Sequence, residues 1–328
     1  EKVGQLNVGV DFGTKTSGPK TKKIEGSIEF YKKFADHLIG EAYPDPTGIY
    51  IPHKTNSAKL GSYGFDFSLS VTLSSRRFEW KMDLTASHNV DRVRKYDLPY
   101  TEAWPFTDVV NKSVRAGWAV QSIVGYPYAG LDPETGNPLG YINGQVSTDY
   151  AAIKRTLPDS LQYIDHANPT LFGGLLNSFR WGKFGLSFLL TGKGGYSFRK
   201  YINHTDDAAF LMGMYPEDHA QRWQKPGDES KTSVPSLRNP EDPSRYAFYA
   251  GSTATVEKGD HLRLQDIRLS YDLSHFTSRL RIANTAVLYL YINNPGILYK
   301  ATRAKIDPDA LYGMPQARSI NFGVHLIF

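Results

Sequence analysis

Several stretches of the chain alternate strictly between apolar and polar residues, and this period of two constrains the fold most. Within residues 65–73 and 78–87 every second side chain is apolar, and the side chains between them are polar or charged. Side chains two residues apart share one face of a strand, whereas a helix needs apolar residues three and four apart. The short polar stretch Ser74–Arg77 separates the two runs. The pattern predicts an antiparallel hairpin with one apolar and one polar face.

The last ten residues repeat this alternation and end on an aromatic side chain. One face carries five apolar residues, the other is mainly polar, and Ile327 is the apolar exception. The members of the apolar face are Ile320, Phe322, Val324, Leu326 and Phe328, and those of the other face are Ser319, Asn321, Gly323 and His325. The last strand of a bacterial outer-membrane barrel closes the barrel and carries a signal for its assembly. We predict that Gly323, Leu326 and Phe328 form such a signal; the alternative is an edge strand of a soluble sheet.

The same reasoning predicts about nine strands with connections of very unequal length. The strands are expected near 4–12, 24–31, 65–73, 78–87, 175–181, 184–190, 261–273, 285–293 and 319–328. Long polar or irregular loops are expected near 35–60, 92–170, 201–258 and 294–318, whereas Ser74–Arg77 and Gly182-Lys183 are short turns. Counting strands back from the C-terminus places both short turns on the same side as Phe328. Short periplasmic turns and long extracellular loops are typical of membrane barrels. We therefore predict an all-β, antiparallel transmembrane β-barrel.

Composition is compatible with this fold and narrows the choice of function. The chain has 328 residues and no apolar run of the roughly 18 residues that a membrane helix needs. A mean hydropathy of −0.42 suits a soluble protein, but also a barrel in which only alternate residues meet lipid. The absence of cysteine excludes disulfides and thiolate metal sites. The net charge of +5 is scattered rather than gathered into a stripe, so no nucleic-acid partner is predicted.

Enzyme signatures are missing from the sequence. It contains no zinc-protease, nucleophile-elbow or phosphate-loop motif, and its nine histidines are dispersed. Asp132, Glu134 and Asn137 are oxygen donors in a turn, which raises the alternatives of a calcium site or a plain turn, and a plain turn is favoured. Asp132 and Glu134 are also the only suggestive carboxylate pair for a secreted β-rich hydrolase. We predict no enzyme activity, no cofactor and no metal.

Loop and wall side chains suggest other roles. His37, His53, His204 and His219 fall in predicted loops, where a lone histidine is most often simply solvated. Eight loop aromatics are equally suited to gripping a sugar or peptide and to packing the loops together: Tyr43, Tyr50, Trp104, Tyr126, Tyr128, Trp223, Tyr246 and Tyr249. The polar faces of the strands would line the lumen or touch a plug through Glu79, Lys81, Asp83, Asn321 and His325.

Five stretches occur in the order found in one known family. They are residues 24–33, 125–136, 168–196, 259–271 and 319–328, which together span nearly the whole chain. In these stretches the chain resembles the C-terminal part of the SusC/RagA family, TonB-dependent transporters of the Bacteroidetes outer membrane. About nine strands cannot close the large plugged barrel of that family. The resemblance therefore implies that residues 1–328 are the C-terminal portion of one barrel domain whose plug and remaining wall lie outside this chain.

The resemblance also implies partners and a function. Such a barrel takes up oligosaccharides or oligopeptides under a SusD-like surface lipoprotein, with energy from the TonB complex acting on the plug. The expected surroundings are outer-membrane lipid, and the substrate-binding residues stay unassigned. Because the chain begins at Glu1, we expect a processed or partial chain. The main alternative is a soluble carbohydrate-binding or adhesin β-domain with its apolar face turned inward.

Overall fold

One nine-stranded antiparallel sheet dominates the computed structural model, and we call it the wall. The structure describes residues 1–16, 21–42, 53–97, 102–107, 114–200, 220–237, 242–279, 283–311 and 314–328. The strands of the wall are β1 (Lys2–Thr16), β2 (Thr21–Ala42), β3 (His53–Ser74), β4 (Phe78–Tyr96), β9 (Leu171–Trp181), β10 (Phe184–Gly194), β13 (His261–Asp272), β14 (Thr285–Lys300) and β15 (Ser319–Ile327).

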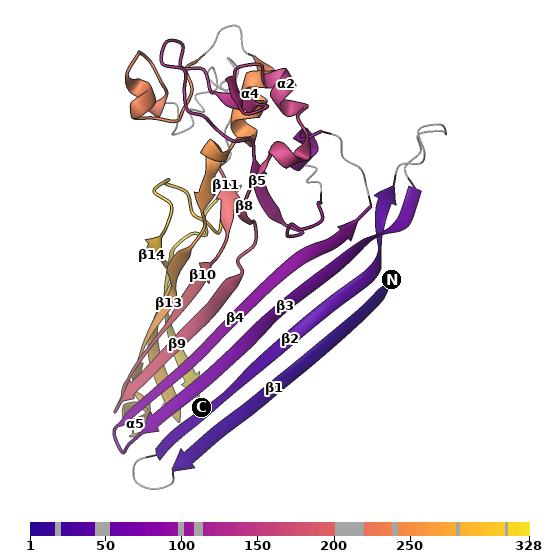
Figure 1. The fold of residues 1–328 in the computed structure, drawn as a ribbon. Coiled ribbons are helices and arrows are strands. Elements are labelled where there is room, and N and C mark those ends of the chain that lie inside the picture. The colour runs from indigo at the N-terminus through magenta and orange to yellow at the C-terminus, as the bar shows by residue number, and fades with distance from the viewer. Residues whose placement is uncertain are drawn as a thin grey trace.

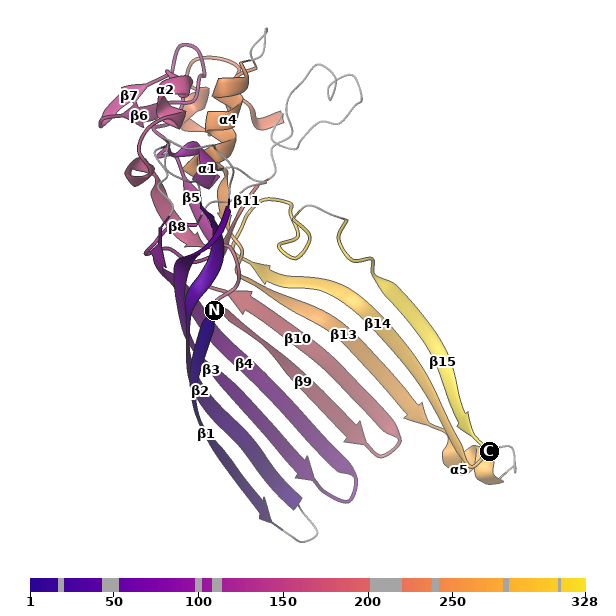
Figure 2. The same ribbon diagram turned by 90° about the vertical axis from the view of Figure 1, so that its right-hand side faces the viewer.

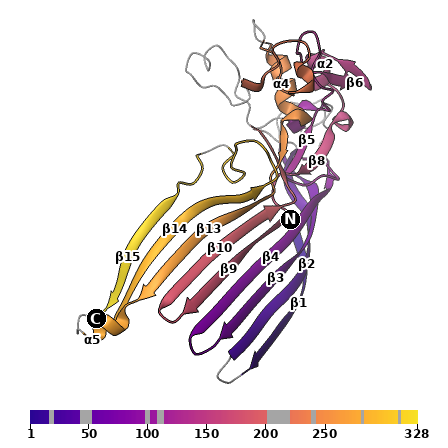
Figure 3. The same cartoon turned by 90° about the vertical axis from the view of Figure 1, so that its left-hand side faces the viewer.

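The wall strands follow one another in chain order, β1-β2-β3-β4-β9-β10-β13-β14-β15, as an up-and-down meander (Figure 1). The turns at 75–77 and 182–183, helix α5 (Ser274–Arg279) and the C-terminus all lie at the same end of the wall (Figure 2). The connections that run from β4 to β9 and from β10 to β13 lie at the other end (Figure 3). The predicted all-β, antiparallel fold class and the nine strands are thus confirmed, whereas β2, β3 and β14 run into the ranges 35–60 and 294–318, for which the sequence predicts loops.

The strands run further than the alternation predicts. Strand β2 continues to Ala42, and β3 begins at His53. His37 and His53 therefore lie in strands and not in a loop, while His204 and His219 lie outside the described residues. The pairing of β2 with β3 shifts register between Ala35 and Leu38, and a bulge of this kind moves later side chains to the opposite face. Because the bulge interrupts the alternation of apolar and polar residues, the alternation in the sequence ends before the strand does.

The two faces of the wall differ as the alternation predicts. Across β3 and β4, Leu69 pairs with Leu84 on the apolar face, and Ser70 pairs with Asp83 on the polar face. The apolar face remains bare: Val8 is 58% exposed on β1 and Phe322 79% exposed on β15. A soluble β-domain would cover such a face with a second sheet or a helix. Among the described residues no helix is long and apolar enough to cross a membrane.

The long connections pack together into a compact unit above the wall, which we call the cap. It comprises the described residues within 97–170 and 195–260. Its elements are α1 (Trp104–Thr107), β5 (Ser122–Gly125), β6 (Gly140–Ile142), β7 (Gln145–Ser147), α2 (Tyr150–Lys154), η1 (Pro158–Ser160), β8 (Gln162–His166), β11 (Ser197–Arg199), η3 (Asp228–Ser230), α4 (Pro243–Gly251), η4 (Thr253–Thr255) and β12 (Val256–Lys258). Its core joins side chains of both connections: Ala103, Phe106, Val124, Tyr126, Tyr150, Ile153, Leu161 and Phe248.

Candidate functional site

The polar face of the wall carries paired charges at the level of the short turns and above. Arg180 on β9 donates to Glu79 on the neighbouring β4 at 3.0 Å. One layer higher, Lys81 lies 2.9 Å from Asp83, which also accepts a 2.7 Å hydrogen bond from Ser70. Glu79, Lys81 and Asp83 therefore share one face, as predicted. In a membrane barrel the polar face is the one that lines the lumen.

The apolar face gathers aromatic side chains near the short turns. Trp181 is 72% exposed there, and the Phe184 ring lies 4.6 Å from that of Tyr271. Aromatic girdles at this level mark the border between hydrocarbon and water in outer-membrane barrels. One polar residue, Asn177, also lies on this face, and its side-chain oxygen accepts a 3.1 Å hydrogen bond from the Trp80 indole. That bond satisfies a polar atom that hydrocarbon would leave without a partner.

The predicted assembly-signal residues lie on β15 and just beyond its end. Gly323 is on the polar face opposite Tyr289, and a Cβ there would come within 2.3 Å of the Tyr289 ring. Leu326 is on the apolar face, and Phe328 is 82% exposed at the turn end of the wall. An aromatic ring lying over a strand glycine covers backbone that would otherwise be bare. The signal itself stays a prediction.

Most of the described loop aromatics pack the cap together. Tyr126, Tyr249 and Trp223 are only 1%, 4% and 8% exposed. Burial raises the pKa of Tyr126 to about 12, because a phenolate loses its hydration there. Burial likewise raises the pKa of Tyr128, whose hydroxyl donates to the Ser233 carbonyl at 3.0 Å. Between the two alternatives left open by the sequence, these four rings serve packing.

The remaining loop aromatics are less enclosed. Trp104 is 45% exposed, and its indole N–H donates to Glu102 at 2.7 Å, which fixes the orientation of the partly exposed ring. Tyr246 in α4 is half-buried. Tyr43 and Tyr50 lie outside the described residues. Trp104 is therefore the described loop aromatic that is best placed to stack on a ligand.

The side chain of Asp132 closes its own turn. One carboxylate oxygen of Asp132 accepts from the Glu134 and Thr135 amides at 3.0 and 2.8 Å, and from the Thr135 hydroxyl at 2.8 Å. The side-chain oxygen of Asn137 accepts a 2.8 Å bond from Arg245. Hydrogen bonds from Thr135, followed by the bond from the Glu134 amide, lower the pKa of Asp132. Among the described residues no group of three or more metal-ligating side chains occurs.

Two arginines that the sequence pattern does not single out, the half-buried Arg199 and the buried Arg245, hold the cap together. Arg199 on β11 donates to the carbonyls of Ala250 and Ser252 at 2.8 and 2.7 Å, and it also reaches the carbonyl of Val124. Arg245 on α4 bonds to Asn137 and, at 2.8 Å, to the carbonyl of Ser236. Each joins segments that are far apart in the chain. Spacing within the sequence gives no signal for such partners, because the carbonyls that they bind belong to residues of any type.

Comparison with known proteins shows which proteins have a similar sequence or architecture. None of the protein-family models matches the sequence. The curated TonB-dependent receptor P26 of Formosa agariphila is 23% identical over 315 residues, which cover 85% of this chain and 28% of that receptor. A solved structure of the RagAB peptide transporter superimposes with a TM-score of 0.70 at 18% identity, covering 99% of this chain and 35% of that one. The RagAB peptide importer in its open-open state gives a TM-score of 0.68 at 16% identity, covering 94% and 34%.

The wall, its cap and these matches define part of an outer-membrane β-barrel. More particularly, the chain is similar to a portion of TonB-dependent receptors of the SusC/RagA kind, the resemblance that its sequence motifs predict. The Formosa relative agrees with the expected Bacteroidetes origin. The chain spans about a third or less of the proteins that it matches, between 28% and 35% of their lengths.

Proposed function

We propose that the chain forms part of the wall and of the extracellular surface of a TonB-dependent importer. The importer takes up oligopeptides or oligosaccharides across the outer membrane. The observation that carries this proposal is the division of one sheet into a bare apolar face and a charged face, with a folded cap at one end only. A lipid-embedded passage with an extracellular entrance requires this combination.

The proposed partners follow from the same geometry. The outer edges of β1 and β15 have no neighbour among the described strands, so the sheet needs further strands of the same receptor to close. The charged face would then surround the plug, on which the TonB complex acts. A SusD-like lipoprotein would cover the cap, and the RagAB name of the solved neighbours supports a partner of this kind.

The substrate is proposed as a class. The solved neighbours are named as peptide transporters, which supports oligopeptides for this chain, while the partly exposed ring of Trp104 suits stacking on a sugar ring. The chain is proposed to have no enzyme activity. Asp132, one of the two carboxylates that the sequence suggests for a hydrolase, uses its side chain to close its own turn.

The proposal is tested on native protein extracted from membranes in detergent. We expect the chain to co-purify with the plug, the rest of the barrel and a surface lipoprotein. Uptake of a fluorescent oligopeptide mixture and of a fluorescent oligosaccharide mixture is then compared in cells with and without the receptor. Recovery of a lone, detergent-independent species of about 36.8 kDa would contradict the proposal.

A further inference from the structure

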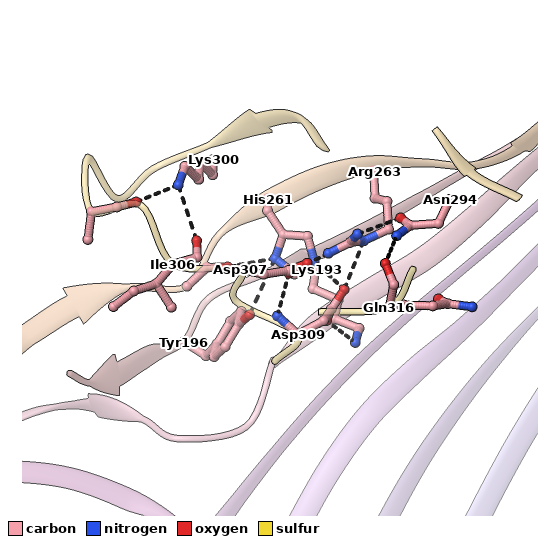
Figure 4. Close-up of polar contacts among 12 residues, drawn as sticks. Lys193, Tyr196, His261, Arg263, Asn294, Lys300, Ile306, Asp307, Asp309 and Gln316 are labelled. Atoms are coloured by element: carbon pink, nitrogen blue, oxygen red, sulfur yellow. Dashed lines mark hydrogen bonds and ion pairs between the residues drawn. The ribbon is translucent and has the colours of Figure 1, made fainter. Parts of the chain in front are cut away.

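The segment between β14 and β15 is fixed to the lumen face of the wall by a charged cluster. Figure 4 shows the cluster at the cap end of β10, β13 and β14. Asp309 accepts from Lys193 on β10 at 2.6 Å and from Arg263 on β13 at 3.1 Å. Arg263 also pairs with Asp307 and donates to Asn294 on β14 at 2.9 Å. Two aspartates of one segment are thus bound by two neighbouring strands, β10 and β13, and β14 contributes a hydrogen bond to Arg263.

The strand register shows on which face the cluster lies. Ser87 pairs with Phe172, Phe172 with Lys193, and Lys193 with His261, so these four side chains form one row across the wall. Ser87 is eight residues from Glu79 on the same uninterrupted strand, and both therefore point to the charged face. The cluster consequently faces the lumen. We call residues 303–311 the strap.

Side chains rather than a backbone ladder fix the strap. Its residues belong to no strand or helix. Just before the strap, Thr302 is 4% exposed and donates to Glu257 of the cap at 2.9 Å. Lys300 donates to the carbonyl of Ile306 in the strap at 3.1 Å. Beyond these contacts Asp307 and Asp309 supply the ion pairs to the wall, so their loss would free the strap from residue 307 onward while its first part stays anchored.

The cluster depends on both of its carboxylates. His261 is only 1% exposed, and its two ring nitrogens face acceptors: the Gly259 carbonyl at 2.8 Å and Asp309 at 3.2 Å. Nδ1 also lies 3.3 Å from the Tyr196 hydroxyl, and the two acceptors favour the doubly protonated, positively charged ring. With Lys193 and Arg263 this places three cationic side chains against two aspartates. Removing the Asp309 charge would leave them with one counter-charge, and neighbouring like charges repel.

We propose that the strap is a latched element of the passage: Asp307 and Asp309 hold it against the wall, and its release narrows the entrance to substrate. The five residues 307–311 span at most about 18 Å when fully extended, which limits how far this part of the strap can move from the wall. Asp307 and Asp309 act as positioning residues, since they touch the wall and not the substrate. This inference rests on the proposed import function.

The test uses the complete receptor in nanodiscs, made free of cysteine outside the labels; this chain itself contains none. Spin labels on Ala310→Cys in the strap, next to Asp309, and on Ser187→Cys on the lumen face of β10 report the distance between strap and wall. Asp309→Asn should lengthen and broaden this distance and reduce uptake of the fluorescent substrates in cells. Asp309→Glu keeps the carboxylate and should behave as the parent does. Asp97→Asn, which removes an exposed ion pair with Lys95, is the matched control and should change neither readout.

A second variant keeps the proposal testable where Asp309→Asn prevents assembly. Lys193→Cys with Asp309→Cys, bridged by a short thiol crosslinker, replaces the ion pair by a covalent tether and should keep uptake at the parent level. Cleaving the tether should then lower uptake. An unchanged distance in Asp309→Asn would overturn the latch, and a longer distance with unchanged uptake would overturn its role in the passage. A parent receptor that takes up neither substrate mixture would instead count against the proposed function, since the distance readout is independent of transport.

Discussion

The wall and the cap treat apolar side chains in opposite ways. The wall leaves them bare, with Val10 at 63% and Trp181 at 72% exposure, whereas the cap encloses Phe248 completely at 0%. The cap thus encloses its own apolar core away from water, while the wall needs an apolar medium against its outer face. The outer face of the wall is suited to lipid and the cap is suited to water. The boundary between the two media lies where the wall strands meet the cap.

The largest expected effect is on the cap core. Phe248→Ala should destabilise the cap by about 3–5 kcal/mol, because the ring packs between Tyr126 and Tyr150 and its loss leaves a cavity. Hydrogen exchange should show faster exchange of cap amides while β4 stays protected. Leu157→Ala removes a side chain that is 66% exposed on the cap and serves as the control. Equal exchange in both variants would mean that the cap has no cooperative core of its own.

A charge placed on the outer face of the wall should have the next largest effect. Leu69→Arg should cost roughly 2–4 kcal/mol if this position lies near mid-bilayer, as an arginine does when it faces lipid. Ser70→Arg should cost far less, because it places the charge beside Asp83 on the lumen face. Unfolding of the complete receptor from lipid vesicles by denaturant measures both. Similar, small losses of unfolding free energy in the two variants would show that the two faces of the wall meet the same solvent.

Two neighbouring glycines give a finer test of the wall. A Cβ on Gly173 would come within 2.3 Å of the Thr85 carbonyl oxygen in the β4 backbone, whereas a Cβ on Gly174 would meet nothing nearer than 3.7 Å. Gly173→Ala should therefore cost about 1–3 kcal/mol, as overpacking does, and Gly174→Ala should cost little. The same vesicle unfolding assay compares them. A greater loss for Gly174→Ala would contradict the strand register.

The smallest expected effect is that of acid on the strap. The hydrogen bond from His261, opposed by burial and assisted by Lys193, holds the pKa of Asp309 well below its usual range. A carboxyl with a lowered folded-state pKa contributes its full stability above about pH 4 and loses it only as the pH falls towards that lower value. The distance between strap and wall should thus stay constant from neutral pH to about pH 5. Release within that range would show that Asp309 is not bound as described.

The wall was largely predictable from the sequence, and the cap was not. Alternation along residues 65–73 and 78–87 sets the faces because each strand meets two different solvents. The strand ends escape prediction where bulges change the phase, as near His37. The cap depends on partners that are distant in the chain: Arg245 reaches Asn137 108 residues away, and Tyr128 reaches Ser233 across 105. The alternation of apolar and polar residues along a strand carries no information about such distant pairs. The packing role of Tyr126 and Tyr249 is therefore visible only in the folded structure.

The most direct test of the central claim is a cysteine scan of β4 from residue 79 to residue 86 in the complete receptor. Each single cysteine carries a fluorophore, and quenching by a lipid-bound quencher is compared with quenching by a water-soluble one. Strong lipid quenching is expected at Trp80, Met82, Leu84 and Ala86, and strong aqueous quenching at Glu79, Lys81, Asp83 and Thr85. Quenching that does not alternate along the strand would contradict a wall with lipid on one side and a passage on the other.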